Sequence, residues 1–485
     1  MTPQPHTDRS RWLALYVLCV GVLMIVLDVT IVNVALPSIQ DDLRFSSSSL
    51  AWVVNAYLIA FGGLLLLAGR LGDLIGRRTV FLAGLTLFTV ASLACGSAQN
   101  QEMLVGARFV QGIGGAMTSA VILGMIVTMF PEPRAQAKAI GVYAFVASAG
   151  GSVGLLAGGV LTESINWHWI FFVNVPIGIA TAAAAMRLIA HDEGLGLRSG
   201  ADVPGAVLIT SSLMLGVYTI VKPAAEDGWG STGALTLGAI SLALVVAFVV
   251  WESRAPTPLI PLRIFRSRSI SGANAIQALS VAGMFGVFFL GSLYLERVLG
   301  YSPLEIGLAF LPVTAVMGTL SVRCSEPLVM RFGARNTVLP GMALIAGSLA
   351  LFARSPVDGV FVRDVMPAML LLGAGSGIAF PALMNLAMSG ARPEEAGLAS
   401  GLVNTSAQVG GALGLAVLAT LSSSHTDALR DDGEPLASAL TSGYHLAYLI
   451  GAALVLAAIV VGLTVVKSDR PAGERFGVEP VAEAA

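Results

Sequence analysis

Charged residues are scarce in this chain of 485 residues, where Asp, Glu, Lys and Arg together make up 12% of the sequence. A soluble domain carries about 25%. The three cysteines, Cys19, Cys95 and Cys324, lie in or at the end of apolar stretches, which argues against a disulfide framework. A net charge of −2 offers no basic surface for DNA or RNA. We therefore expect no nucleic-acid partner and no disulfide-bonded soluble domain.

Patterns typical of enzymes are missing as well. The sequence has no metal-ligand spacing, no phosphate-binding loop and no arrangement typical of a catalytic nucleophile. We expect no metal, no cofactor and no enzymatic activity. The sequence also has no nucleotide-binding domain that could hydrolyse ATP.

Long apolar stretches are abundant. Hydrophobic residues make up 55% of the chain, and the mean hydropathy is +0.82. A membrane-spanning helix needs roughly 20 mostly apolar residues. Fourteen such stretches are centred near residues 25, 60, 88, 115, 149, 179, 212, 242, 282, 314, 345, 376, 408 and 454. They predict an all-α polytopic membrane protein.

The basic residues predict its orientation. If the N-terminus is cytoplasmic, most of the 27 Lys and Arg residues fall in inner segments, as the positive-inside rule requires. We expect both termini in the cytoplasm and a multi-pass location in the cell membrane (the inner membrane of a cell with two). The first apolar stretch is not followed by a small-residue cleavage site and predicts a retained span.

An internal repeat is visible in the glycines. A shift of 260 residues places Gly150, Gly151 and Gly154 over Gly410, Gly411 and Gly414, and shifts of 257 and 261 relate two other pairs of spans. Duplicated halves with a substrate site between them are a known transporter architecture. We predict an N-terminal segment 1–12, a six-helix bundle 13–190, a linker 191–267 with two extra spans, a second six-helix bundle 268–466 and a tail 467–485. Two complete bundles in one chain favour a monomer.

Asp28 lies about halfway along the first span. An ionisable group there costs roughly 2.5–3.5 kcal/mol, so it usually faces a polar cavity and binds something. Arg108 in the fourth span lies at similar depth, which allows an ion pair if the two helices are neighbours. Proton release from Asp28 would then follow conformation. A static buried pair or a snorkelling Arg108 is the alternative.

The loop after the second span reads Gly69-Arg70-Leu71-Gly72-Asp73-Leu74-Ile75-Gly76-Arg77-Arg78. Its glycines, Gly69 and Gly76 among them, permit a tight turn and close helix approach. Asp73 can cap the next helix or pair with Arg77, which would make the loop a conformational latch. A basic loop that only sets topology is the alternative.

These motifs, together with the stretch from Trp167 to Pro176, resemble the major facilitator superfamily, and within it the fourteen-span drug:proton antiporters. The resemblance covers about residues 12–466. It implies two pseudo-symmetric six-helix bundles plus two extra central helices, and export of amphipathic drugs or antibiotics driven by inward proton flow. Asp28 and Arg108 match the family's first-span acid and fourth-span base, and Asp73 and Arg77 match its loop motif.

The sequence departs from the family pattern at two positions, and the second half departs from the first at a third. Leu155 replaces the proline of the fifth-span antiporter motif, so any proline kink is lost. His168 replaces an arginine; it either titrates near neutral pH or is a satisfied interfacial histidine. In the second half Met330 occupies the position of Asp73.

Polar residues on apolar helices are candidates for a substrate cavity. Those of the first half are Asn33, Trp52, Asn55, Tyr57 and Gln111, and those of the second are Asn274, Gln277, Asn385, Asn404 and Gln408. We expect some of them to bond between helices instead. The leading interpretation is a proton-coupled exporter of small molecules. A substrate-specific proton symporter or facilitator for uptake, and a membrane sensor or scaffold, are the alternatives.

Overall fold

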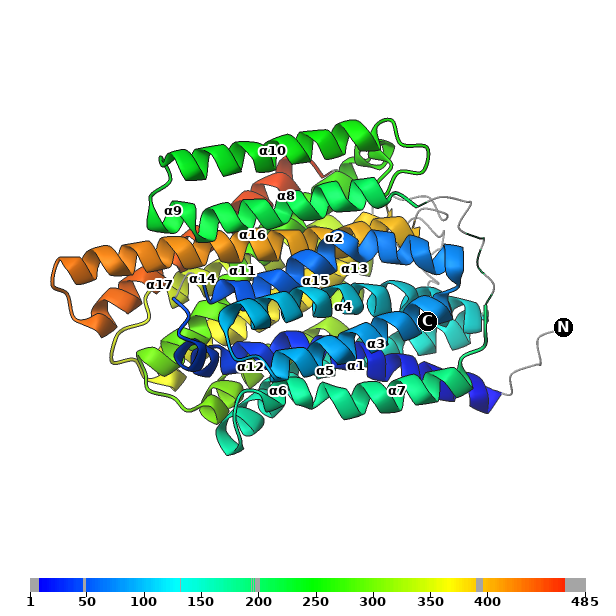
Figure 1. Cartoon of the computed structure of the whole chain (residues 1–485), viewed down its shortest axis with the longest axis horizontal. Helices are drawn as coiled ribbons and strands as arrows, with labels where there is room; N and C mark the ends of the chain where they lie inside the picture. The colour runs from blue at the N-terminus through cyan, green and yellow to red at the C-terminus, as the bar shows by residue number, and fades with distance from the viewer. Residues whose placement is uncertain are drawn as a thin grey trace, which may run out of the picture.

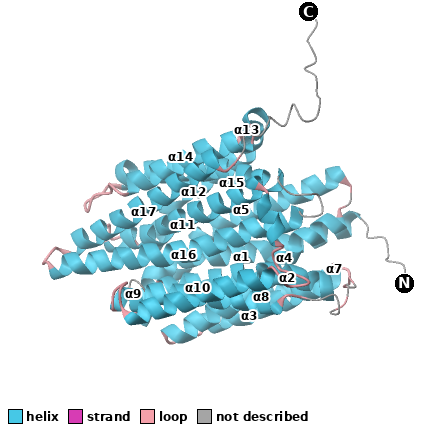
Figure 2. Cartoon of the chain, turned by 90° about the horizontal axis from the view of Figure 1, so that it is seen from above, coloured by secondary structure: helices cyan, strands magenta, loops and turns pink. Residues whose placement is uncertain are grey.

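The computed structural model describes residues 8–46, 49–130, 132–192, 194, 196, 201–389 and 396–466. The predicted tail 467–485, and residues 1–7 of the predicted N-terminal segment, lie outside the described residues. Within the described ranges, all regular secondary structure is helical (Figure 2).

The helices follow one another with short connections. Up to residue 190 they are α1 (Asp8–Leu43), α2 (Ala51–Ile75), α3 (Arg77–Gly96), α4 (Gln101–Met129), α5 (Pro133–Ser164), α6 (Trp169–Phe172) and α7 (Asn174–Leu188). The next are α8 (Val203–Val221), α9 (Pro223–Glu226), α10 (Thr232–Glu252) and η2 (Leu262–Arg266). The last are α11 (Arg268–Arg297), α12 (Pro303–Arg323), α13 (Ser325–Phe332), α14 (Ala334–Phe352), η3 (Phe361–Val365), α15 (Met366–Ser389), α16 (Ala396–Asp431) and α17 (Leu436–Thr464).

Thirteen helices among the described residues are long and apolar enough to span a membrane, with α6 and α7 counted together and η3 and α15 counted together. The helix α5 has 32 residues and lies at the predicted fifth span, and its part Val153–Ser164 is apolar. The fourteen predicted spans therefore correspond to these thirteen helices and α5. The long helices run side by side along one direction (Figure 1). We call the end at which α1 begins the proximal end and the end at which α1 finishes the distal end.

The repeat predicted from the glycines is also found in the packing of α3 on α4 and of α14 on α15. A Cβ atom added to Gly114 would lie 2.8 Å from the carbonyl oxygen of Gly84, and one added to Gly375 would lie 2.6 Å from that of Gly341. Small residues let two helix backbones approach this closely. The same register of close contacts therefore occurs twice in the chain.

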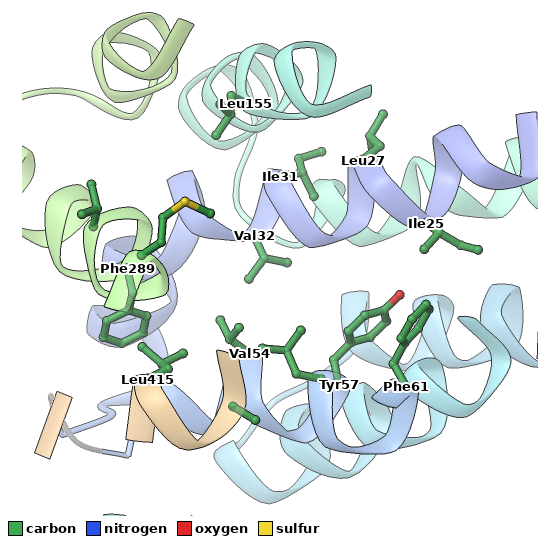
Figure 3. Packing of buried hydrophobic residues seen from close by; sticks show 14 of the residues in the cluster. Ile25, Leu27, Ile31, Val32, Val54, Tyr57, Phe61, Leu155, Phe289 and Leu415 are labelled. Atoms are coloured by element: carbon green, nitrogen blue, oxygen red, sulfur yellow. The ribbon is translucent and has the colours of Figure 1, made fainter. Parts of the chain in front are cut away.

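A second pair of contacts repeats between α1 and α5 and between α11 and α16. A Cβ atom on Gly154 would lie 3.0 Å from the carbonyl oxygen of Leu27, and one on Gly414 would lie 2.6 Å from that of Ala282. Figure 3 shows α1 with Leu27 and Ile31 near Leu155 of α5, and Phe289 of α11 beside Leu415 of α16. The predicted correspondence of the fifth and thirteenth spans is confirmed by these contacts.

The two additional spans, α8 and α10, form a hairpin at the edge of the bundle (Figure 1). The helix α8 packs on α2 and α16, whereas α10 packs chiefly on α8 and leaves most of its apolar surface exposed. Such a surface suits contact with lipid, because apolar side chains are favourable in the hydrocarbon of a membrane. The hairpin therefore lies outside the repeated helices.

We call α1 to α7 the first set of helices and α11 to α17 the second set, and the two sets are in contact at the distal end. Arg297 at the end of α11 forms an ion pair with Asp41 at the end of α1. The carboxylate of Glu163 on α5 accepts a hydrogen bond of 3.0 Å from the amide of Leu304, near the start of α12. Distal contacts of α1 and α5 with α11 and α12 thus hold this end together in the conformation described.

Candidate functional site

Asp28 is held inside the first set of helices. Its side chain is fully buried, and both carboxylate oxygens accept hydrogen bonds. Arg108 Nη1 of α4 donates to Asp28 Oδ2 at 2.5 Å, Gln111 Nε2 donates to Oδ1 at 2.7 Å, and Asn174 Nδ2 of α7 donates to Oδ1 at 3.1 Å. Arg108 and Gln111 stand one helical turn apart and therefore share a face of α4. The predicted Asp28–Arg108 ion pair is present; its role in coupling stays a prediction.

A second layer of contacts fixes the donors around Asp28. Ser92 Oγ of α3 accepts hydrogen bonds of 3.1 Å from both Gln111 and Asn174. Arg108 Nε donates to the carbonyl oxygen of Val53 at 2.9 Å, and the ring of Tyr57 lies 4.4 Å from the guanidinium carbon. The charge of Arg108 thus meets a carboxylate, a carbonyl and an aromatic face, each of which stabilises a buried cation.

Each charge of the buried Asp28–Arg108 pair is stabilised by the other. Removing one partner of a buried ion pair leaves an uncompensated charge, at a cost of about 3–5 kcal/mol. Protonation of Asp28 would have the same consequence for Arg108, which would then have to find another anion or water. In the conformation described, no solvent reaches Asp28. A proton could therefore reach Asp28 only in another conformation, in which α1, α4 and α7 separate.

The loop motif joins three helices at the proximal end. Arg77 Nη2 lies 3.2 Å from Asp73 Oδ1, while Arg77 Nη1 donates to the carbonyl oxygen of Gly124 on α4 at 3.0 Å. Gly76 has a φ of +95°, a region that L side chains rarely adopt. A Cβ atom on Gly69 would meet only Ala120, at an ordinary 3.9 Å. The predicted Asp73–Arg77 pair is present, and all these contacts stay within α2, α3 and α4.

Asp192 is part of this loop site and was not found from the sequence. Its carboxylate accepts hydrogen bonds from the backbone amides of Arg77 at 2.6 Å and Arg78 at 3.0 Å, the first residues of α3. Free amides at a helix start attract an anion. The amide of Gly196 also donates to Leu74 at 2.9 Å. The segment after α7 is thereby attached to the loop. An aspartate in a polar linker carries no signal that predicts this contact.

The cavity candidates of the first set have different surroundings. Gln111 belongs to the Asp28 network, and the Asn33 amide donates to the carbonyl of Val29 on its own helix. Asn55 is fully buried, yet neither atom of its side-chain amide has a hydrogen-bond partner, and the Tyr57 hydroxyl has none either. Trp52 is half-buried. Asn55 and Tyr57 thus keep unused hydrogen-bonding capacity on one helix.

The candidates of the second set lie on α11, α15 and α16. Asn274 is buried and its side-chain oxygen accepts a hydrogen bond of 2.7 Å from Ser406, which joins α11 to α16. Asn385 is exposed and donates to Pro381 of its own helix. Asn404 is exposed, Gln277 is half-buried, and Gln408 packs against Gly62 of α2. That these residues line a common cavity stays a prediction.

The departures from the family pattern have structural counterparts. The helix α5 continues through Leu155, whose carbonyl oxygen lies 2.6 Å from the position of a Cβ on Gly307 of α12. His168 stacks on Trp167 at 3.8 Å between ring centroids, outside the spans. Burial lowers the pKa of His168, although Asp42 and the Ala98 backbone act to raise it. The neutral imidazole is therefore favoured.

Asn174 and Ser92 were also missed as members of the site. Asn174 lies in the stretch that carried the family resemblance, and Ser92 is a lone hydroxyl in an apolar span. Only their position across from Gln111 reveals their part in holding Asp28. Among the described residues, no group of three or more His, Cys, Asp and Glu side chains could hold a metal ion.

Known proteins match this chain over most of its length. The Major Facilitator Superfamily matches residues 18–415. The puromycin resistance protein of Streptomyces alboniger is 37% identical over 98% of this chain and 95% of its own length. The cephamycin export protein of Amycolatopsis lactamdurans is 38% identical over 92% and 91%, and the tetracenomycin C resistance and export protein of Streptomyces glaucescens 34% over 87% and 78%.

Solved structures show the same fold. A bacterial homologue of the human lysosomal transporter Spinster, in an inward-facing and unoccupied conformation, has a TM-score of 0.69 at 16% identity and covers 96% of this chain and 99% of its own. The POT family transporter PepTSo has a TM-score of 0.68 at 14% identity, over 95% and 99%. Sequence relatives and fold agree, and the chain belongs to the Major Facilitator Superfamily, as a membrane transporter of small molecules and not an enzyme.

Proposed function

We propose that this transporter exports antibiotics or other amphipathic small molecules in exchange for protons. The relatives named above confer resistance to puromycin or export cephamycin and tetracenomycin C. The observation that carries the coupling is the buried carboxylate of Asp28, which is bonded to Arg108, Gln111 and Asn174 from two other helices. A carboxylate at this depth is costly to bury, and such residues usually mark functional sites.

In this mechanism the two six-helix bundles, 13–190 and 268–466, rock about the cavity between them. The proximal end faces the cytoplasm with both termini, the chain acts as a monomer in the cell membrane, and Asp73 with Arg77 serves as a latch. A proton that arrives from outside neutralises Asp28 and releases Arg108, which loosens α1 from α4 and favours substrate release. The distal contacts of Asp41 and Glu163 must open for that step.

Substitution of Asp28 by Asn tests the coupling. Asn keeps the size and some hydrogen bonds of Asp28 but binds no proton, so we expect gradient-driven efflux of a dye or antibiotic to fall to the level of cells without the transporter. Membrane insertion, measured by the amount of folded protein, should persist. The Asp28→Glu variant retains a carboxylate and should retain part of the efflux. Full gradient-driven efflux by Asp28→Asn would remove Asp28 from the coupling.

The second candidate is uptake by proton symport or facilitated diffusion. The continuous α5 helix at Leu155 favours it, because the family's antiporter motif has a proline there. Cells loaded with a candidate substrate separate the two functions when the proton gradient is collapsed. Export predicts that accumulation rises, symport predicts that it falls, and facilitated diffusion predicts no dependence on the gradient.

A further inference from the structure

The proximal end of the α8–α10 hairpin holds a second buried acidic pair that the proposed mechanism does not use. Asp202 caps the start of α8 and Glu252 is the last residue of α10, and only 4% and 3% of their surfaces are exposed. Such groups are almost never this buried unless they are paired. One carboxyl group lies at the start of α8 and the other at the end of α10, and the two meet at the proximal end of the hairpin.

Each carboxyl group uses one oxygen for fixed hydrogen bonds. Asp202 Oδ1 accepts from the Gly205 amide at 2.8 Å and from the Trp251 indole at 2.7 Å. Glu252 Oε2 accepts from the Ile260 amide at 3.1 Å, in the segment that leads to η2. All three donors are neutral N–H groups. They orient the carboxyl groups but add no positive charge to balance them.

The remaining oxygens converge on one point. Asp202 Oδ2 and Glu252 Oε1 are both buried without a hydrogen-bond partner. A Cβ atom added to Gly205 would lie 2.5 Å from Asp202 Oδ2 and 2.8 Å from Glu252 Oε1. The missing side chain of Gly205 therefore provides the space in which two unpartnered acceptors face each other. Two acceptors cannot bond unless one of them carries a hydrogen.

Among the residues that the structure describes, no charged side chain donates a hydrogen bond to the pair. On the segment after α10, Arg254 and Arg266 are exposed to solvent, and Arg263 of η2 lies at the same end of the bundle. Arg70 is the basic residue near the proximal end of α2, which packs against α8. In the part of α16 that the structure describes, the charged side chains lie at the distal end. Within the described ranges, Asp202 is thus the charged group that faces Glu252.

We propose that Asp202 and Glu252 share one proton and form a proton-binding site separate from Asp28. Two close carboxylates cannot both ionise in a buried site, so one stays protonated and donates to the other. A metal ion fits less well, because hard cations require about six oxygen ligands and only two oxygens are free here. The shared proton holds the ends of α8 and α10 and the Ile260 segment together.

Infrared difference spectroscopy on the purified full-length protein in lipid nanodiscs tests this site. The Glu252→Gln variant should lose one protonated carboxyl C=O band relative to the wild type, and Asp202→Asn, which keeps a capping side chain, should lose the same band. The Glu132→Gln variant is a matched control, because Glu132 is exposed and paired with Arg11 at the same end. Its spectrum should keep the band.

Melting temperatures provide a second measurement. The wild type should lose stability from mildly acidic to mildly alkaline pH as the shared proton leaves, whereas Glu252→Gln, a permanent hydrogen-bond donor, should lose that part of the pH dependence. An unchanged carboxyl band in both variants would overturn the proposal. So would a Glu252-dependent rise in melting temperature on addition of sodium or calcium chloride, because it would assign the site to a metal cation. Neither measurement depends on Asp28 or on the direction of transport.

Discussion

The two sets of six helices share a packing register but differ in what the register encloses. Leu27 lies against Gly154 as Ala282 lies against Gly414, so Gly283 takes the place that Asp28 has in the first set. There Gly283 packs against Gly451 of α17, with the Gly451 carbonyl oxygen 2.6 Å from a Cβ position. In the first set a charged network joins α1 to α7; in the second, two backbones touch.

The fourth helix of each set shows the same contrast. At a shift of 261 residues, Arg108 on α4 corresponds to the fully buried Met369 on α15. The buried polar contacts of α11 with its neighbours join uncharged side chains: Ser280 Oγ donates to Met342 Sδ at 3.0 Å, and Ser406 Oγ donates to Asn274 Oδ1 at 2.7 Å. Close helix packing is therefore found in both sets, whereas among the described residues the fully buried ion pair is found in the first. This difference agrees with the proposal that proton coupling depends on Asp28.

The two sets differ less at their proximal turns, around Gly76 and Gly333, than inside the membrane. Gly76 and Gly333 both have positive φ, and the arginines that follow, Arg78 and Arg335, donate to carbonyl oxygens at the ends of α7 and α17. Cations at a helix C-terminus interact favourably with its dipole. The contact between an arginine and the end of a helix therefore occurs in both sets. The Asp73–Arg77 pair has no counterpart at the corresponding residues Met330 and Ala334.

The largest expected effect comes from the same substitution at the two corresponding positions. Arg108→Leu leaves Asp28 buried without its cation and should lower the free energy of unfolding by about 3–5 kcal/mol. Met369→Leu conserves volume and should cost less than about 1.5 kcal/mol. Melting temperatures of both purified variants measure the difference. The double variant Asp28→Asn/Arg108→Leu should recover part of the loss. Equal losses for the two single variants would contradict an asymmetric charge network.

A smaller and symmetrical effect is expected at the repeated glycine contacts. Gly114→Ala would place a methyl group 2.8 Å from the Gly84 carbonyl oxygen, and Gly375→Ala one 2.6 Å from that of Gly341. Overpacking of this kind costs about 1–3 kcal/mol, so both variants should lose similar stability in thermal unfolding. Gly106→Ala is the control, because nothing lies within 4 Å of its added methyl group. A loss in only one half would show that the two packing interfaces are not equivalent.

The smallest effect is expected at two histidines near the distal end. His445 Nε2 lies 2.8 Å from the Ser355 carbonyl, so His445→Gln should cost about 1 kcal/mol. The His168 Nδ1 atom is buried without a partner, and burial lowers the pKa of His168. Because the folded-state pKa is lowered, the neutral ring stabilises the fold above pH 6.5, and this contribution is lost as the pH falls through the folded-state pKa.

His168→Gln removes that titration. Its free energy of unfolding should match the wild type within about 0.5 kcal/mol at neutral pH, and acidification should destabilise it less than the wild type. Melting temperatures measured against pH test both statements. A wild type that gains stability relative to the variant on acidification would show that His168 binds its proton more tightly when folded.

Much of the fold was predictable because membrane-spanning helices can be recognised from the length and apolar composition of single stretches of sequence. The spans, the glycine repeat and the depth match of Asp28 with Arg108 all follow from positions along single helices. The partners of these residues were harder to predict. Gln111 was expected in the cavity but bonds to Asp28, and Asp192 and Asn174 act across separations that sequence spacing does not encode.

The sequence alone determined that the chain forms long membrane helices, which of them repeat, and that the acid and base at mid-membrane depth, Asp28 and Arg108, lie in the first half. Hydrophobic length and glycine spacing are local properties, so they can be read from neighbouring residues. Only the tertiary structure decided which donors surround Asp28 and that Asp202 meets Glu252 at the base of an added hairpin. Both depend on helices that are distant in the chain and are brought together by close backbone packing.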